Sequence, residues 1–141
     1  MKKLVKKIEM VQHRAIRYVE KNNIREEGIV SGLLRKRRWL SLEGRRRAIR
    51  VNFIHKIIRG DVAINMNEFF TYKPTRTRAM NKYPLYIKAA NNNIVSSSFF
   101  HRTPKDWNLI ENQIIEPLSS GNFLYKLQSK YLSEELSCAA Y

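Results

Sequence analysis

Cysteine, glycine and long apolar runs are scarce in this sequence, and each scarcity excludes a class of protein or site. Cys138 is the single cysteine of the 141 residues, so the chain forms neither an intramolecular disulfide nor a multi-thiolate zinc site. The 5 glycines are isolated, which excludes a glycine-rich phosphate loop. No run approaches the roughly 18 apolar residues of a membrane-spanning helix. We therefore expect an intracellular protein, nuclear or cytoplasmic, without a membrane partner.

The residues that catalysis and metal binding require are also few. The three histidines are His13, His55 and His101, and no spacing among them brings two imidazoles onto one helical face. The sequence has no Asp-Asp or Asp-x-Asp pair that could hold the two metal ions of a polymerase or nuclease. We therefore predict no catalytic residue, no metal site and no cofactor, and we expect a protein that is not an enzyme.

Positive charge is the feature in excess. The chain contains 27 Lys and Arg against 12 Asp and Glu, a net charge of +15 with a pI near 10.3. Residues 1–60 hold 18 basic and 5 acidic side chains, whereas residues 61–141 hold 9 and 7. Such an excess is typical of proteins that bind polyanions. The N-terminal part of the chain, residues 1–60, is therefore expected to carry most of the attraction to a negatively charged partner.

Hydrophobic periodicity predicts a mainly α protein, a small helical domain with about four helices and an irregular or short-strand middle section. The expected helices cover residues 4–19, 42–59, 103–117 and a last segment that begins at Ser119 or Ser120. Short strands or extended loops are expected between them, over residues 61–100. We assign residues 1–133 to a single basic helical domain, in which 1–60 is strongly basic and 61–133 is near neutral. Residues 134–141 are expected to form a frayed tail.

Specific residues predict where the helices begin and end. Ser41 is the expected N-cap of the 42–59 helix and Gly60 its end. Gly44 stands where a glutamate would complete a capping box with Ser41. Thr103 is the expected N-cap of the third helix, with Pro104 at its first position. Trp107, on the apolar side of that helix, is expected to anchor the core.

The first helix is expected to be amphipathic. Its apolar stripe contains Leu4, Ile8, Val11, Ala15 and Val19. Its other face is basic, as in helices that lie on membrane surfaces, but the stripe lacks the Trp or Phe anchors that such helices often carry. A membrane-surface role is therefore disfavoured.

Basic residues flank a tryptophan in the N-terminal part of the chain. The candidate nucleic-acid-binding residues are Arg35, Lys36, Arg37, Arg38, Trp39, Arg45, Arg46, Arg47 and Arg50. Guanidinium groups bind phosphate oxygens through two parallel hydrogen bonds. Charge runs are often solvated faces, but several clusters in one segment favour binding, with RNA expected in preference to DNA. Two roles remain open for Trp39, stacking on a base and packing beneath the 42–59 helix.

Four segments carry patterns more specific than charge. Residues 8–17 read IEMVQHRAIR, residues 40–47 LSLEGRRR, residues 53–57 FIHKI and residues 98–108 SFFHRTPKDWN. Together they resemble the C-terminal segment that follows the polymerase and thumb regions in endonuclease-reverse transcriptases of jockey-like non-LTR retrotransposons. The last segment, similar to S-F-F-P-R-T-I-x-x-W-N, is the most specific.

This resemblance implies contact with template RNA or target DNA and an upstream reverse-transcriptase domain as a second partner. The palm aspartate pair and the endonuclease domain of the family lie upstream of such a segment and are not in this chain, so no catalytic residue is carried over. Two hypotheses follow. The chain is a non-catalytic nucleic-acid-binding module, or it is a structural fragment that docks on an absent polymerase domain and has no independent function.

Overall fold

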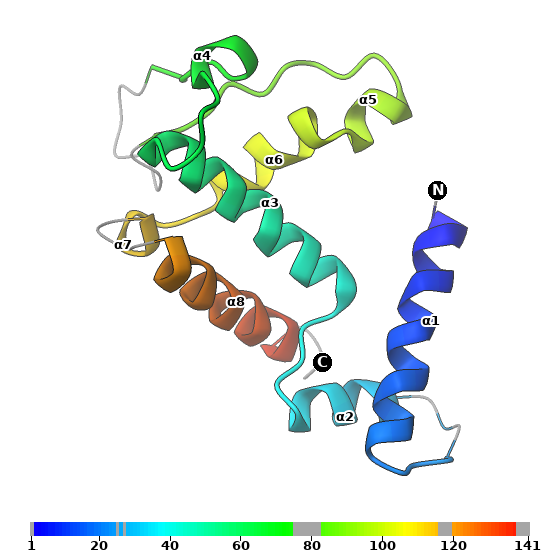
Figure 1. Ribbon diagram of the computed structural model, residues 1–141. Coiled ribbons are helices and arrows are strands. Elements are labelled where there is room, and N and C mark those ends of the chain that lie inside the picture. The colour runs from blue at the N-terminus through cyan, green and yellow to red at the C-terminus, as the bar shows by residue number, and fades with distance from the viewer. Residues whose placement is uncertain (1, 25, 27, 75–82, 116–119, 138–141) are drawn as a thin grey trace. The chain divides into compact units, whose positions relative to one another are not determined.

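A computed structural model describes residues 2–24, 26, 28–74, 83–115 and 120–137 (Figure 1). The helices in these ranges are α1 (Lys2–Val19), α2 (Ile29–Lys36), α3 (Leu42–Arg59), α4 (Met66–Phe69), α5 (Asn93–Ser97), α6 (Phe99–Asn108), α7 (Asn112–Ile115) and α8 (Ser120–Ser137). No strand forms within the described ranges, where an isolated antiparallel bridge joins Tyr72 and Leu85. The prediction of a mainly α protein is confirmed.

The four predicted helices correspond to α1, α3, α6 and α8, and the other four are shorter. The middle section is irregular, as predicted, although the stretch expected to be a strand or a loop near residue 95 is helical. There the side chain of Asn92 accepts a hydrogen bond from the Val95 N–H at 2.8 Å and caps α5. Residues 75–82 of the middle section lie outside the described residues.

The predicted start of the third helix was wrong. Helix α6 begins at Phe99, four residues before the expected cap, and Thr103 is buried within it. The Thr103 hydroxyl donates a hydrogen bond to the Phe99 carbonyl at 2.6 Å, and Pro104 lies inside the helix. The capping pattern at Thr103 and Pro104 predicted the wrong start, because burial of His101 and Thr103 stabilises an earlier helical turn that this pattern does not encode. The predicted continuation to residue 117 is interrupted between α6 and α7.

The chain divides into two compact units. One comprises Met1–Arg46 and Gln128–Tyr141, and the other comprises Arg47–Leu127. We call them the terminal unit and the central unit. Helices α3 and α8 each contribute residues to both. In the segment predicted to be a frayed tail, α8 continues to Ser137, and residues 138–141 lie outside the described residues.

The central unit has an apolar core. Its buried apolar side chains include Val51, Ile54, Ile57, Phe70, Leu85, Trp107, Ile110, Phe123 and Leu127. Trp107 is wholly buried, as predicted, and its indole N–H donates to the Tyr83 carbonyl at 2.8 Å. Asn108 binds both the N–H and the carbonyl of Leu85 at 2.8 Å. These two side chains of α6 therefore hold the irregular segment around residue 85 in place.

In the terminal unit, α1 packs against α2 (Figure 1). Little of the apolar stripe of α1 is buried. Ile16 is fully buried, and the Gln12 side chain donates to the Leu40 carbonyl at 2.8 Å. Leu4 and Val11, in contrast, are each 64% exposed. Most of the stripe predicted from the sequence therefore faces solvent.

The two ends of α3 form as the sequence predicts. The Ser41 hydroxyl accepts a hydrogen bond from the Gly44 N–H at 3.0 Å, which confirms Ser41 as the N-cap. Gly60 adopts a left-handed conformation with φ of 76°, and the Asp61 N–H donates to the Lys56 carbonyl at 2.9 Å. This pattern is a Schellman motif, in which a left-handed residue satisfies the last carbonyls of a helix.

Candidate nucleic-acid interface

The end of α2 positions the first group of candidate residues. The Trp39 N–H donates to the Leu34 carbonyl and the Arg38 N–H to the Arg35 carbonyl, both at 2.9 Å. These bonds form a Schellman motif in which Arg38 takes the left-handed conformation, with φ of 54°. Residues other than glycine adopt this conformation at a cost of about 1 to 2 kcal/mol. The chain reverses direction here and presents a series of cationic side chains to solvent.

We call Arg35, Lys36, Arg37, Arg38 and Trp39 the basic ridge. Two of its cations bind one carboxylate: Lys36 Nζ lies 2.8 Å from Glu20 Oε2, and Arg37 Nε pairs with Glu20 Oε1. The Glu20 side chain is 7% exposed. Hydrogen bonds from Lys36 and Arg37 lower the pKa of the Glu20 carboxyl below its ordinary value. Glu20, the residue that follows α1, therefore anchors the ridge to the end of that helix.

The other cations of the ridge are unpaired within the described part of the chain. Arg35 and Arg38 are exposed, and neither makes an ion pair with a described residue. Trp39 is 39% exposed, whereas Leu40 is buried. The ridge thus presents two uncompensated guanidinium groups next to a partly accessible indole. Both roles that the sequence left open for Trp39 are compatible with this exposure.

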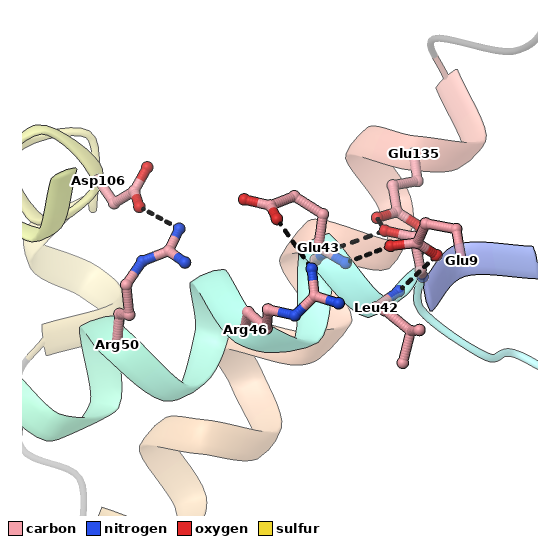
Figure 2. A network of polar contacts seen from close by, with 9 residues as sticks. Glu9, Leu42, Glu43, Arg46, Arg50, Asp106 and Glu135 are labelled. Carbon is pink, nitrogen blue, oxygen red and sulfur yellow. Dashed lines mark hydrogen bonds and ion pairs between the residues drawn. The ribbon is translucent and has the colours of Figure 1, made fainter. Parts of the chain in front are cut away.

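Arg45 and Arg46 lie in the terminal unit, on the first turns of α3. Arg45 is exposed and makes no ion pair with any described residue. Arg46 Nη1 lies 3.3 Å from Glu43 Oε2 on the preceding turn. Figure 2 marks this ion pair between the two side chains. Both side chains of that pair are partly exposed, so the pair is weak and Arg46 remains accessible to a partner.

Arg47 and Arg50 belong to the central unit and share a carboxylate of α6. Arg47 Nε lies 3.1 Å from Asp106 Oδ1. Arg50 Nη2 lies 3.0 Å from Asp106 Oδ2, and Figure 2 shows the Arg50 side chain pointing toward this carboxylate. The Arg50 side chain is 14% exposed and that of Asp106 is 18% exposed. Both guanidinium groups therefore join α3 to α6 within this unit. The sequence, which placed them among the candidate binding residues, could not indicate this pairing, because Asp106 is 59 residues from Arg47 and 56 from Arg50.

The histidines are not gathered into a site. His55 is buried and stacks on the Phe123 ring, with centroids 3.9 Å apart, and burial lowers its pKa. His101 is also buried. Among the described residues, no group of three or more His, Cys, Asp or Glu side chains could hold a metal ion.

Sequence reasoning missed a group of aromatic side chains in the central unit. Phe69, Tyr86 and Phe100 are exposed and line a common hollow with Lys88. The adjacent phenylalanine pairs at residues 69–70 and 99–100 were the available signal. The segment between them lacks periodicity, so the sequence did not indicate that these rings meet.

Comparisons with known proteins identify no relative. No family model, no curated protein and no solved structure matches the chain. None of the helices in the described ranges combines the length and the apolar character needed to cross a membrane.

Proposed function

We propose that this chain is a non-catalytic module that binds nucleic acid, RNA in preference to DNA, through the basic ridge. The proposal depends chiefly on the conformation and surroundings of Arg38. This residue occupies a left-handed position where glycine would be less strained, it is exposed, and no described residue pairs with it. The contacts among the described residues give no reason for a cation there, whereas a phosphate would bind one.

The charge distribution supports the same partner. The ridge lies within residues 1–60, which contain 18 basic and 5 acidic side chains. Cations near the end of α2 also interact favourably with the helix dipole, which accounts for part of this clustering. The dipole effect falls off within the last turn and does not require four consecutive cations. The resemblance to the C-terminal segment of retrotransposon reverse transcriptases independently favours an RNA or DNA partner.

A salt series tests the proposal. Affinity for a hairpin RNA and for a DNA duplex would be measured between about 50 and 200 mM salt, with circular dichroism to verify folding. The logarithm of the binding constant falls as the logarithm of the salt concentration rises, and each phosphate neutralised makes this decline steeper by about 0.7 to 0.9. We expect R35A/R38A to reduce that slope by about 1.5. The matched control, K105A/K126A, removes the same charge from exposed positions outside the ridge and should change it less. Equal reductions in both variants would contradict a localised site.

A second candidate function rests on the exposed stripe of α1. Leu4, Ile8 and Val11 are at least half exposed on one helix. Contiguous apolar surface of this kind often marks an interface. The stripe favours the alternative in which the chain is a structural fragment that docks on an upstream reverse-transcriptase domain. Under that alternative the isolated chain self-associates and binds RNA and DNA without preference.

A further inference from the structure

Two hollows in the central unit share a wall of aromatic rings. The first, of about 340 Å³, is lined only by apolar side chains, which include five of the six phenylalanines. The second, of about 250 Å³, shares the rings of Phe69, Phe70 and Phe100 and adds Glu68, Thr71, Tyr86 and Lys88. We call the second one the aromatic hollow. The residues that line it carry aromatic rings, two hydroxyls, a carboxylate and an ammonium group.

Backbone contacts hold the parts of the aromatic hollow together. The Tyr86 N–H donates to the Thr71 carbonyl at 2.8 Å, beside the bridge that joins Tyr72 and Leu85. Leu85 is fully buried and bound by Asn108, so the position of the next residue, Tyr86, is constrained. Tyr86 itself is 57% exposed.

The phenylalanine wall is built on packed rings. Phe69 and Phe100 are stacked, with centroids 5.6 Å apart and planes 14° apart. Phe100 also meets Phe99 edge to face at 5.5 Å. These contacts constrain the positions of the two rings. Phe69 is nevertheless 44% exposed and Phe100 54% exposed, although burying apolar rings is favourable. Surface aromatic rings held in this way are a platform on which a flat ligand can stack.

The lining of each hollow selects its ligand. A nucleobase has an apolar face and a polar edge, and the apolar hollow would leave that edge without hydrogen-bond partners. The aromatic hollow offers such partners in Thr71 and Glu68, and Lys88 can bind a phosphate. Its volume lies below the roughly 300 Å³ at which sites for drug-sized ligands begin, which suits a single base.

We propose that the aromatic hollow binds one unpaired nucleobase of single-stranded RNA, which stacks on the Phe100 and Tyr86 rings. This inference rests on the proposed function and extends it to a second, non-ionic contact. A base within a duplex is stacked on its neighbours and cannot enter the hollow, so the contact discriminates single strands from duplexes.

Two measurements test the inference. First, the affinities of a 12-nucleotide single-stranded RNA and of an RNA duplex are compared for the wild type, F100L and Y86L. Each substitution should weaken single-strand binding about tenfold, leave duplex binding unchanged and preserve the salt slope, because the rings neutralise no phosphate. The control variant is Y125L, which removes an exposed ring that does not line the hollow. Second, adenosine 5′-monophosphate is titrated while the ring resonances of Phe100 and Tyr86 are followed by NMR.

The outcomes separate the two proposals. If adenosine 5′-monophosphate shifts the ring resonances but no RNA binds, the hollow stands and the proposed function fails. If RNA binds but F100L and Y86L behave like Y125L, and the nucleotide shifts no ring, the base site is overturned while the basic ridge stands. Shifts produced by free indole and not by the nucleotide would also overturn it, because they would assign the hollow to an apolar side chain of a protein partner.

Discussion

The carboxylate of Glu135 occupies the space beside Gly44 that any larger side chain at position 44 would need. From α8 it accepts hydrogen bonds from the Ser41 N–H at 3.2 Å and from the Ser41 hydroxyl at 2.6 Å. In a capping box, a glutamate three residues after the cap binds the N–H of the cap residue. Here Gly44 stands at that position, and Glu135 takes the role from a different helix (Figure 2).

We therefore expect G44A to destabilise the protein despite the higher helix propensity of alanine. Alanine favours a helix over glycine by about 1 kcal/mol, but its Cβ would displace Glu135 and remove hydrogen bonds to a charged group, worth about 1.5 to 3 kcal/mol. The free energy of unfolding in urea should fall by about 1 kcal/mol. In the E135A background the same substitution should raise it by about 1 kcal/mol. An equal change in both backgrounds would exclude the coupling.

Replacing Arg38 should change stability and RNA binding in opposite directions. We expect R38G to raise the free energy of unfolding by about 1 kcal/mol, because glycine adopts the left-handed conformation without strain. The same substitution should weaken RNA binding and reduce its salt slope by about 0.7 to 0.9. K21G is the matched control, because Lys21 is also left-handed, with φ of 49°, and lies outside the ridge. It should stabilise the protein equally and affect RNA binding less.

Glu20 should make stability depend on acid pH. Its pKa is lowered in the folded protein, so the carboxylate contributes stability that is present above the pKa of the unfolded state, near 4.5, and is lost as pH falls through the folded value. Denaturant unfolding measured between pH 3 and 7 should show E20Q less stable than the wild type at pH 7. The difference should vanish at the acid end. A constant difference across this range would refute the ion-pair explanation.

Arg50 and Arg38 should respond to substitution in opposite ways. We expect R50A to lower the free energy of unfolding by about 2 kcal/mol, because it removes a charged hydrogen bond to Asp106 in a largely buried setting. RNA affinity should change less than about twofold. R38A should reduce RNA affinity and leave stability nearly unchanged. If R50A weakens RNA binding as strongly as R38A, the guanidinium of Arg50 contacts the nucleic acid after all.

The exposed stripe of α1 separates the two candidate functions. Leu4 and Val11 can be replaced by glutamate without burying charge, because both are 64% exposed. If the stripe is an interface that the isolated chain leaves uncovered, L4E/V11E should suppress self-association in analytical ultracentrifugation. Under our principal proposal, the preference for RNA over DNA persists in this variant apart from the electrostatic effect of two added charges. Equal affinity for RNA and DNA in the folded variant would favour the structural alternative.

The S-F-F and W-N segments at residues 98–108 have a structural explanation in this chain. Phe99 and Phe100 line the apolar hollow, and Trp107 and Asn108 hold the irregular segment around residue 85. The pattern on which the proposed resemblance to the reverse-transcriptase family chiefly rests therefore serves the packing of the central unit. If the aromatic hollow binds a nucleobase as we propose, the exposed ring of Phe100 is the only part of residues 98–108 that contacts it.

The sequence by itself determined the helical class, both ends of α3 and the concentration of positive charge in the N-terminal part of the chain. These features depend on neighbours along the chain: periodicity is read over a few turns, Ser41 caps an N–H three residues away, and Gly60 supplies the conformation at its own position. Net charge depends on no contact at all.

Only the tertiary structure decided which basic side chains form ion pairs within the protein and where α6 begins. Asp106 reaches Arg50 across 56 residues, and Glu135 reaches Ser41 across 94. Burial of Thr103 and His101 outweighs the local capping signal before Pro104. Such contacts join residues that the chain separates widely, and no pattern in a single sequence states which distant carboxylate will meet which arginine. The free cations of the ridge and the rings of the aromatic hollow could therefore be distinguished from their neighbours only after folding had assigned the partners.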